Sequence, residues 1–567
     1  MSLDDLWYRN AIIYCLDVEK YQDANGDGIG DFEGLTRRLD YLAGMGVTCV
    51  WLQPFYPSPN RDNGYDVTDY YNVHEKHGSL GDFVNFINHA EALGLRVIVD
   101  LVANHTSVDC PWFQDARRSP HSFYRDWYVW SDIRPKNHKE GIVFPGQQTT
   151  TWSMDRKARQ YYFHRFYNHQ ADLNTWNPYV RSEIRKIMGF WLQLGVSGFR
   201  MDAVPFLIEK KGAGVEHQQD FNILKEMRDF LQWRSSGAIL LAEANVPPDE
   251  SMNYFGDDGD RIQMMLNFAV NQRLFYALAT ADTQPLVWAL EQTAKRPPNG
   301  QWVNFLRSHD ELDLGRLTVE QRQRVFDAFG PRKTMQLYNR GIRRRLAPML
   351  GNNRARMELA FSLLFSLPGT PMMQYGDEIG IGENLRLPER ECARTPMQWT
   401  NEQHGGFSLS KTVVRPVIND AEFGFKKVNV ADQRRDPHSL LNWTERVIRM
   451  RCECPEIGWG SFSVLRTNVS EVLALRYDWR GTSLVTLHNF SSRQQKLKIK
   501  VGTERDGVLV EVFADRHSRA DADGVHRITL DGYAWRWYRV GAADNALYRT
   551  DLQQDAPEAP TARAPGR

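Results

Sequence analysis

The sequence lacks an excess of charge of either sign, and it lacks long apolar runs. Its 567 residues carry 70 lysines and arginines against 70 aspartates and glutamates. This balance argues against nucleic acid or an anionic membrane as the main partner, since both attract basic surfaces. No stretch of about 18 apolar residues, the length that crosses a bilayer, occurs. The opening residues MSLDDLWYRN have neither the basic nor the apolar region of a secretory signal peptide.

Cysteine is also scarce, whereas aromatic residues are abundant. The six cysteines stand at positions 15, 49, 110, 392, 452 and 454, and they form no cluster with zinc spacing. We expect free thiols in a reducing compartment, which predicts a cytoplasmic protein. The 17 Trp, 22 Tyr and 28 Phe suit a neutral ligand with apolar faces, such as a sugar, although most aromatics in any protein are core residues.

Eight short apolar runs recur along the chain, and segments with helical spacing separate them. Near-continuous apolar strands are typical of a parallel sheet that is buried on both faces. Eight such strands alternating with helices close a (β/α)₈ TIM barrel, an α/β fold. The predicted strands span residues 11–18, 47–55, 96–105, 199–204, 239–245, 264–270, 302–310 and 371–378.

Two interruptions and one change of pattern divide the chain into predicted domains. Residues 106–175 are too long for a plain loop and predict an inserted subdomain over the barrel mouth, after the third strand. A second excursion, about 318–354, is Arg-rich and predicted to be helical, and an amphipathic helix is predicted at 439–451. Alternating residues and turns then predict a C-terminal antiparallel β-sandwich domain over 455–545. The barrel would comprise 1–105 and 176–454, and the Pro/Ala-rich tail 546–567 is predicted to be disordered.

Acidic side chains follow three of the predicted strands. Asp202 comes at the end of the fourth strand, Glu243 at the end of the fifth and Asp310 at the end of the seventh. The C-terminal ends of barrel strands meet at one mouth, where the active sites of such barrels lie. Any one of these carboxylates could instead cap a helix or lie on the surface. Their joint occurrence indicates an active site.

Carboxylates gathered in this way can cleave an acetal. One attacks the anomeric carbon, and a second, with a raised pKa, protonates the leaving oxygen. Arg200 would keep Asp202 ionised, because a nearby cation lowers a carboxyl pKa by about 1–3 units. Asp202 is therefore the candidate nucleophile, and Glu243, within the apolar run LLAEAN, is the candidate acid/base. In the alternative interpretation, Arg200 and Asp202 form a structural ion pair and His105 is an ordinary buried histidine.

Five spaced motifs resemble, in order, the signature regions of the α-amylase superfamily, glycoside hydrolase family 13. They are GYDVTDY, DLVANH, GFRMDAV, LLAEAN and LRSHDE, and the similarity extends over nearly the whole chain. The segments FYPSPNRDNGYD, GIRRRLAPML and RTPMQW are most similar to the branch of the family that interconverts maltose and trehalose. The resemblance implies a retaining α-glucoside enzyme that forms a β-glucosyl intermediate, with side hydrolysis to glucose.

The resemblance also implies a role for each matching residue. Asp202 would be the nucleophile, Glu243 the acid/base and Asp310 the stabiliser of the transition state, while Arg200 would pair with the nucleophile. Tyr65 would be the aromatic platform beneath the sugar, and Arg394 would close the pocket. The residues expected to bind the sugar directly are Asp66, His105 and His309.

Other outcomes share these catalytic residues. A hydrolytic α-glucosidase or amylase-type enzyme, or another α-glucosyltransferase on short α-glucosides, would carry the same motifs. The segments GIVFPGQQTTTWSMD and YCLDVEKYQD depart from the maltose-converting branch, which bears on the handling of the acceptor. A catalytically inert barrel relative is the non-enzyme alternative, and a homo-oligomer and a maltokinase partner stay open.

A loop after the first strand has the spacing of a metal site. Residues 23–31, DANGDGIGD, place oxygen ligands at alternate positions, but Gly34 stands where an EF-hand needs glutamate. A polar turn is the alternative. The resemblance favours a structural calcium ion here, held by Asp23, Asn25, Asp27, Asp31 and the Ile29 carbonyl. A second ion would use Asn104, Asp172, Glu209 and the carbonyls of Phe206 and Leu207. The reaction itself would need no cofactor.

Overall fold

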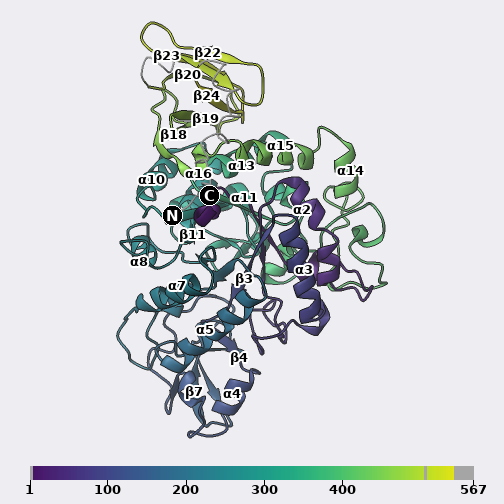
Figure 1. Ribbon diagram of the computed structural model, residues 1–567, viewed down its shortest axis with the longest axis vertical. Helices are drawn as coiled ribbons and strands as arrows, with labels where there is room; N and C mark the ends of the chain where they lie inside the picture. The colour runs from purple at the N-terminus through teal and green to yellow at the C-terminus, as the bar shows by residue number, and fades with distance from the viewer. Residues whose placement is uncertain (1–3, 503–506, 542–567) are drawn as a thin grey trace, which may run out of the picture. The chain divides into compact units, whose positions relative to one another are not determined.

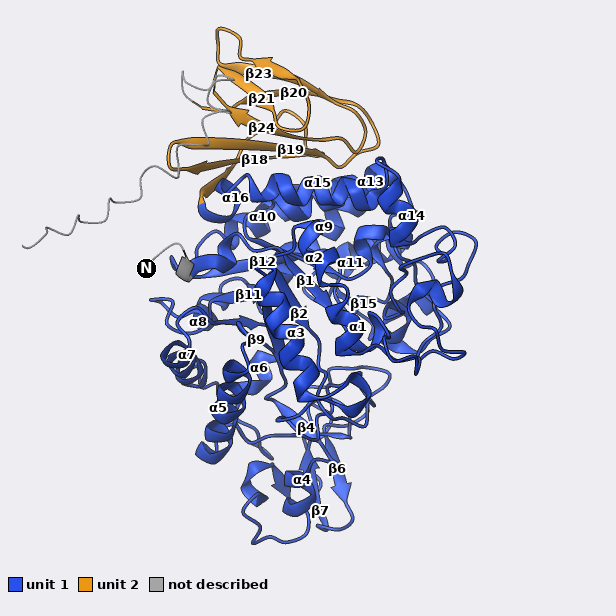
Figure 2. Ribbon diagram, turned by 45° about the vertical axis from the view of Figure 1, so that its right-hand side comes forward, with its two compact units in different colours: residues 1–459 blue, residues 460–567 orange. Residues whose placement is uncertain are grey.

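The computed structural model describes residues 4–502 and 507–541 (Figure 1). The chain forms two compact units, residues 1–459 and 460–567 (Figure 2). The sequence places this boundary at 455, but helix α16 (Glu456–Trp459) belongs to the first unit. The physical reason is that the Gly458 carbonyl accepts a hydrogen bond of 3.1 Å from Gln301 of the barrel. The tail 546–567 lies outside the described residues.

The first unit is built on a closed barrel of eight parallel strands, which confirms the predicted fold class (Figure 1). The strands pair in the order β1-β16-β12-β11-β10-β9-β3-β2. Each overlaps one of the eight predicted apolar runs. They are β1 (Ile13–Leu16), β2 (Cys49–Leu52), β3 (Arg96–Leu101), β9 (Gly198–Met201), β10 (Ile239–Ala242), β11 (Met264–Leu266), β12 (Gln301–Phe305) and β16 (Thr370–Gln374).

The barrel interior is apolar except where two strands bring charged residues together. Ile13, Trp51 and Leu241 belong to a single core cluster formed by seven of the strands and the chain before β1. Asp100 of β3 and Arg200 of β9 are register partners in the parallel pairing. Because both are fully buried, they must compensate each other's charge. This pair lies beneath the acidic residues that follow the strands.

Helices alternate with the strands in the order that the apolar spacing predicts. Helix α3 (Leu80–Ala92) begins with a capping box between Ser79 and Asp82, and α5 (Pro178–Gln193) begins with proline after the Asn177 cap; both are strong N-terminal signals. The helix predicted at 439–451 is α15 (Leu440–Cys452). The other barrel helices are α1 (Phe32–Thr36), α2 (Leu39–Met45), α6 (Val204–Leu207), α7 (Asn222–Arg234), α8 (Ser251–Phe255), α9 (Phe268–Thr280), α10 (Gln284–Gln292), α13 (Arg354–Ser366) and α14 (Val430–Arg435).

An insertion follows β3, close to the predicted range 106–175, and extends away from the barrel in Figure 2. Strands β4 and β8 pair at its base, and β7 lies between β5 and β6 farther out. Its aromatic residues pack within it, as Val129, Trp152 and Phe163 show by forming their own core. Its elements are β4 (His105–Ser107), α4 (Pro111–Ala116), β5 (Trp130–Ser131), β6 (Trp152–Asp155), β7 (Gln160–Phe163) and β8 (Gln170–Asp172).

The second excursion, about 318–354, is only partly helical, in contrast to the prediction. It contains α11 (Val319–Phe329) and α12 (Leu346–Met349), but also β14 (Gln336–Leu337) and β15 (Gly341–Ile342). Strand β15 pairs with β14 and with β13 (Leu312–Asp313), which directly follows the seventh barrel strand. This small sheet brings the excursion next to the end of β12. We call residues 312–353 the excursion below.

The second unit is an antiparallel β domain, as predicted. A six-stranded sheet has the order β17-β18-β19-β24-β21-β22, and β20 pairs with β23 in a separate two-stranded sheet. Both sheets contribute to one core that includes Leu487, Leu497 and Ile528. The strands are β17 (Ser461–Val464), β18 (Val472–Trp479), β19 (Thr482–Asn489), β20 (Gln495–Lys500), β21 (Val508–Glu511), β22 (His517–Arg519), β23 (Val525–Leu530) and β24 (Trp535–Val540).

Two sequence predictions of a more general kind can be compared with the structure. In the part of the chain that the structure describes, the six cysteines form no disulfide bond, and five of them are buried. Among the residues that the structure describes, no helix has the length and apolar character needed to cross a membrane.

Candidate active site

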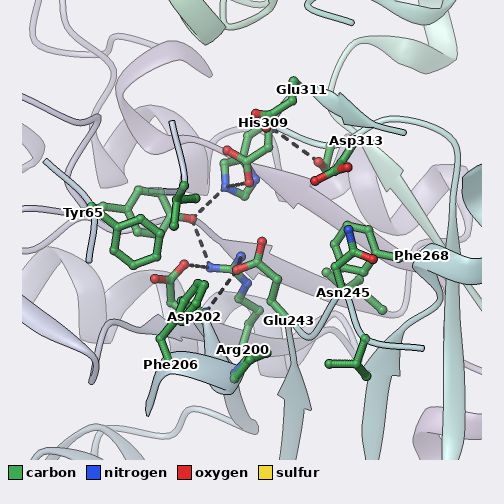
Figure 3. A pocket seen from close by; sticks show the side chains of 18 of the residues that line it. Tyr65, Arg200, Asp202, Phe206, Glu243, Asn245, Phe268, His309, Glu311 and Asp313 are labelled. Carbon is green, nitrogen blue, oxygen red and sulfur yellow. Dashed lines mark hydrogen bonds and ion pairs between the residues drawn. The ribbon is translucent and has the colours of Figure 1, made fainter. Parts of the chain in front are cut away.

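The three candidate catalytic carboxylates line one cavity at the C-terminal end of the barrel, and Figure 3 shows two of them, Asp202 and Glu243, with Arg200 between them. Asp202 directly follows β9, Glu243 directly follows β10, and Asp310 lies five residues beyond the last residue of β12. The cavity has a volume of about 430 Å³, within the range of small-molecule sites. The sequence prediction that brought these residues together is therefore consistent with their placement. Other lining residues include Trp51, Asp62, Gln170, Phe206, Glu311 and Arg390.

One guanidinium group organises the carboxylates. Arg200 Nη1 lies 2.7 Å from the carboxylate of Asp202, and Arg200 Nη2 lies 2.7 Å from that of Glu243. Arg200 Nη1 also pairs with Asp100 below (Figure 3 shows the upper contacts). Retaining glycosidases hold their two carboxyl groups about 5–5.5 Å apart, a separation that a single guanidinium contacting both can bridge. Arg200 is thus a structural ion-pair partner and part of the site at once.

Burial places the pKa values of the two facing carboxyls in the order that the chemistry requires. It raises the pKa of Asp202 to about 6, against the opposing effect of Arg200. It raises the pKa of Glu243 to about 7, again against Arg200. Arg200 lowers the pKa of Asp202, as the sequence predicts, but removal from water outweighs the cation, so the net shift is upward. The raised pKa of Glu243 is what a general acid requires.

The backbone between the two carboxylates is strained. Ala203, which follows Asp202, has φ 49° and ψ 43°, the left-handed region. Its N–H donates to the carboxylate of Glu243 at 3.1 Å. A non-glycine residue holds such a conformation only where its surroundings impose it, and such residues cluster at functional sites. The strained turn fixes the direction of Asp202 relative to Glu243.

Asp310 has the opposite electrostatic setting. Burial by itself would raise its pKa, but the charges of Arg390 and Arg394 outweigh burial and hold the pKa of Asp310 below its usual range. Arg390 lies 2.8 Å and Arg394 3.2 Å from the same Asp310 oxygen. Asp310 therefore stays ionised throughout the working pH range, as a group that stabilises positive charge on a sugar ring must.

Tyr65 and the two histidines form the floor and side of the cavity. Tyr65 stacks on His309, with ring centroids 5.6 Å apart and an interplanar angle of 9°. The Tyr65 hydroxyl lies 2.8 Å from His309 Nε2. Burial lowers the pKa values of His105 and His309, so both rings are neutral and available to share hydrogen bonds with hydroxyl groups. These three residues line the cavity where the sequence places sugar contacts.

Two predicted site residues do not line the cavity. Asp66 is fully buried, and its carboxylate accepts hydrogen bonds from Ser58 Oγ at 2.8 Å and from the backbone N–H groups of Arg61 and Asp62. It therefore shapes the loop and has no oxygen directed at the sugar. Arg394 donates to the His309 carbonyl and pairs with Asp310, but it does not line the cavity. It supports the site and does not close it.

Two neighbouring residues that the sequence analysis did not predict line the cavity in place of Asp66 and Arg394. Asp62 and Arg390 line the cavity and form an ion pair of 2.8 Å, which joins the loop after β2 to the loop after β16. The Gln170 amide donates to the other oxygen of Asp62 at 3.0 Å. Asp62 stands four residues before the predicted Asp66, within RDNGYD. Arg390 likewise stands four residues before the predicted Arg394, within RECAR. No pattern in the sequence could tell which member of each pair faces the cavity.

The second predicted calcium position is filled by a lysine ammonium group. Lys211 Nζ lies 2.7 Å from Asn104 Oδ1, 3.0 Å from the Leu173 carbonyl and 3.0 Å from the carboxylate of Asp172. Its side chain is 1% exposed. A cation of the protein's own thus occupies the oxygen cage.

The other residues predicted to hold that ion are engaged elsewhere. The carboxylate of Glu209 pairs with Arg165 at 2.7 Å, and the Leu207 carbonyl accepts from Thr175 at 2.6 Å. With the ammonium group of Lys211 among these oxygen atoms, the residues at this position do not fit a calcium ion as well.

Replacing Lys211 by alanine should destabilise the protein strongly. The carboxylate of Asp172 would remain buried without its partner, and breaking a buried ion pair in this way costs about 3–5 kcal/mol. Thermal unfolding should show a Tm lower by several degrees. Lys210→Ala is the matched control, since the Lys210 ammonium lies over the Trp176 ring at 5.1 Å and its residue is exposed. Equal Tm values for the two variants would contradict the assignment.

The first predicted calcium loop, residues 23–31, is held by its own side chains. Asp23 accepts from the N–H groups of Gly26 and Gly28, and Asp31 accepts from those of Ala24 and Gly34. Asn25 and Asp27 each accept from the N–H two residues further on. In the described ranges 4–502 and 507–541, no group of three His, Cys, Asp or Glu side chains is arranged to hold a metal ion. Calcium at this loop stays a prediction.

The comparisons with known proteins agree with this site. The profile of the alpha-amylase catalytic domain matches residues 16–460, and that of the sucrose hydrolase-like C-terminal domain matches residues 481–539. The chain therefore belongs to the alpha-amylase family, which confirms the resemblance seen in its motifs.

The similar relatives carry a more specific name. Trehalose synthase of Thermus thermophilus is 40% identical over 98% of this chain, which spans 58% of that relative's length. Trehalose synthase/amylase TreS of Mycobacterium tuberculosis is 38% identical over 95% of this chain and 91% of its own. Among solved structures, trehalulose synthase MutB of Pseudomonas mesoacidophila has a TM-score of 0.75 at 25% identity, with 94% of this chain and 100% of that chain covered.

Proposed function

We propose that this protein interconverts maltose and trehalose through a glucosyl-enzyme on Asp202, with some hydrolysis to glucose. The observation that carries the proposal is the single cavity that Asp202, Glu243 and Asp310 line together. Arg390, which also lines this cavity, pairs with both Asp62 and Asp310 and so ties two loops together beside the space that would receive the sugar. The names of the similar trehalose synthases support the same reaction. The substrate is accordingly a small neutral α-glucoside.

The first half of the reaction breaks the glycosidic bond of maltose. An oxygen of Asp202 attacks C1 of the non-reducing glucose, and the bond from C1 to the leaving oxygen breaks. Glu243, protonated because of its raised pKa, gives its proton to that oxygen. Asp310 stabilises the positive charge that develops on the ring. A β-glucosyl ester on Asp202 and a free glucose result.

The second half forms the new bond without release of that glucose. The glucose turns within the cavity until its anomeric hydroxyl faces C1 of the ester. Glu243, now a carboxylate, takes the proton of this hydroxyl, and the oxygen attacks C1 while the ester bond to Asp202 breaks. The product has the α,α-1,1 linkage of trehalose. Water in place of glucose gives hydrolysis, so isomerisation depends on keeping water out.

Incubation with maltose tests the proposal. Chromatographic separation of the products should show trehalose as the main product, with glucose as a minor one, and the enzyme should convert trehalose back to maltose. Glucose without trehalose would reject isomerisation and leave a hydrolytic α-glucosidase. The name trehalose synthase/amylase of the mycobacterial relative makes hydrolysis the second candidate.

The pH dependence follows from two carboxyls that must be in opposite states. Below about pH 6 Asp202 takes up a proton and stops being a nucleophile. Above about pH 7 Glu243 loses its proton and stops being an acid. We expect a bell-shaped plot of kcat/KM against pH with its maximum between these two values. A plot that rises through pH 7 without falling would contradict the assignment of the acid.

Structural calcium at loop 23–31 belongs to the same proposal. Donor chemistry alone supports it: Asp23, Asn25, Asp27 and Asp31 provide oxygen atoms on one short loop, beside the Ile29 carbonyl. The ion would stabilise the loop and take no part in catalysis. EDTA should lower the Tm of the protein and not that of Asp27→Ala. A Tm of the parent protein that EDTA does not change would reject it.

We also propose that the reaction takes place in the cytoplasm, on the evidence of the cysteines. Six cysteines without a disulfide bond among the described residues, five of them buried, suit a reducing compartment. Fractionation of the source cells with an antibody against the protein tests this, and recovery outside the cytoplasm would reject it.

A further inference from the structure

Three separate segments of the chain meet at the carboxylate of Glu389. Tyr167 belongs to the insertion, Tyr338 to the excursion, and Glu389 to the loop after β16. The Tyr338 hydroxyl donates to Glu389 Oε2 at 2.7 Å, and the Tyr167 hydroxyl donates to the same oxygen. The two hydroxyls lie 3.1 Å apart. We call these three residues the latch.

The backbone at the latch is strained. Glu389 has φ 37° and Tyr338 has φ 53°, in the left-handed region that residues with a side chain seldom adopt. Such conformations persist only where surrounding contacts impose them. The hydrogen bonds among the three side chains are contacts of this kind. Loss of the hydroxyls would let the Glu389 loop relax.

The latch is joined to the wall of the catalytic cavity through Arg390. Arg390 follows Glu389 directly and pairs with Asp310 and Asp62, each at 2.8 Å. Its guanidinium lies 5.1 Å from the ring centroid of Phe144, which also lines the cavity. A shift of the Glu389 loop would therefore move Arg390, which lines the cavity.

The aromatic rings of the latch continue this wall. The ring of Phe144 lies 4.8 Å from that of Tyr167 and 4.7 Å from that of Tyr338, measured between centroids. Phe144, Leu337 and Tyr338 are buried together in one cluster. The Phe144 segment is tied to the excursion as well, because Arg340 donates to the Val143 carbonyl at 2.7 Å. Insertion, excursion and loop form one continuous cover.

We infer that the latch sets how often the glucosyl-enzyme loses its glucose or admits water. Its members touch no reacting atom, so they are positioning residues that hold Arg390 and Phe144 in place while the glucose turns. This inference rests on the proposed function and adds what controls its outcome. With the latch intact, trehalose forms; with the latch open, glucose escapes and hydrolysis gains.

The test removes the hydroxyls and keeps the rings. In Tyr167→Phe and Tyr338→Phe the ratio of trehalose to glucose formed from maltose should fall by about threefold each. In the double variant it should fall by about tenfold, because two threefold effects multiply when the two hydrogen bonds act independently. The rate of glucosyl-enzyme formation from an α-glucosyl fluoride should change less than twofold, because Asp202 and Glu243 are untouched.

Added labelled glucose gives a second readout that a purely structural role would not move. During turnover of maltose with [¹³C]glucose, the intact protein should place little label in trehalose, because the released glucose stays inside. The double variant should place several-fold more. Tyr128→Phe is the matched control: its hydroxyl makes a buried hydrogen bond of 2.8 Å to Thr106 in the same insertion, away from the cavity. It should change Tm but neither readout.

The outcomes separate the latch from the proposed function. If the intact protein makes trehalose and the double variant keeps the same product ratio and labelling, the latch is rejected and the function stands. If the intact protein makes no trehalose, the function is rejected. In that case the test of the latch is the ratio of glucosyl transfer to [¹³C]glucose over hydrolysis, compared between the intact protein and the double variant. A changed ratio in the double variant supports it, and an unchanged ratio rejects it.

Discussion

Asp202→Asn should abolish turnover of maltose and trehalose, with kcat lower by about 10⁴-fold or more, the scale expected when a covalent nucleophile is removed. An amide oxygen in the same place still accepts from Arg200, but it cannot form the glucosyl ester. Steady-state assays on both disaccharides measure the loss.

The fold should survive this change. Burial raises the pKa of Asp202, so the ionised carboxyl is less stable in the folded protein than in the unfolded chain, and it lowers stability above its unfolded pKa. The neutral amide removes that penalty. At pH 7.5 the Tm of the variant should equal or exceed that of the parent protein. Activity within tenfold of the parent would reject Asp202 as the nucleophile.

Glu243→Gln should lower kcat/KM on maltose by about 10²–10⁴-fold, the usual contribution of general acid–base catalysis. The loss should be much smaller for formation of the glucosyl-enzyme from an α-glucosyl fluoride, because fluoride leaves without a proton. Stopped-flow measurement of fluoride release follows that step directly. The fall of maltose turnover above about pH 7, which the raised pKa of Glu243 predicts, should be absent from the residual activity of the variant.

Glu311 provides a demanding control for this prediction. It lines the same cavity, and burial raises its pKa to about 7 as well. It is therefore the competing assignment for the alkaline limb of the pH profile. Glu311→Gln should keep that limb and show equal losses on maltose and on the fluoride. If Glu311→Gln removes the limb and Glu243→Gln does not, the roles are reversed.

The fold follows from the sequence because the barrel strands are buried on both faces. That burial requires the near-continuous apolar runs from which all eight strands are predicted. The structure of the excursion is harder to predict from the sequence, since β14 and β15 have only two residues each. Such short strands are formed by pairing with β13 and carry no periodic signal of their own. The domain boundary has no periodic signal either, because helix α16 is held in the first unit by contacts with distant residues, such as that of Gly458 with Gln301 and that of Trp459 with Arg9.

The catalytic residues can be predicted from the sequence for a related reason. A barrel gathers the ends of its strands at one mouth, so Asp202, Glu243 and Asp310 converge by topology alone. The loops that follow the strands have no such constraint. Asp62 faces the cavity and Asp66 does not, because the loop closes on Asp66 through hydrogen bonds to its own backbone.

The second predicted calcium position, where a lysine lies, shows the same limit of prediction from the sequence. Asn104 and Asp172 are correctly brought together, but the cation between them comes from Lys211, in the segment after α6. A sequence pattern of oxygen ligands cannot distinguish a metal ion from an ammonium group, since both require the same negative, oxygen-rich cage. Only the path of the chain after α6 decides between them.

Trapping of the intermediate tests the account most directly. A fluorinated α-glucosyl fluoride should react with the protein and leave a sugar ester that breaks down slowly enough for peptide mass spectrometry. The account predicts one modified peptide, with the sugar on Asp202 within GFRMDAV, and no modification in Asp202→Asn. A sugar on Glu243, on Asp310 or on no residue while the fluoride is still consumed would contradict it.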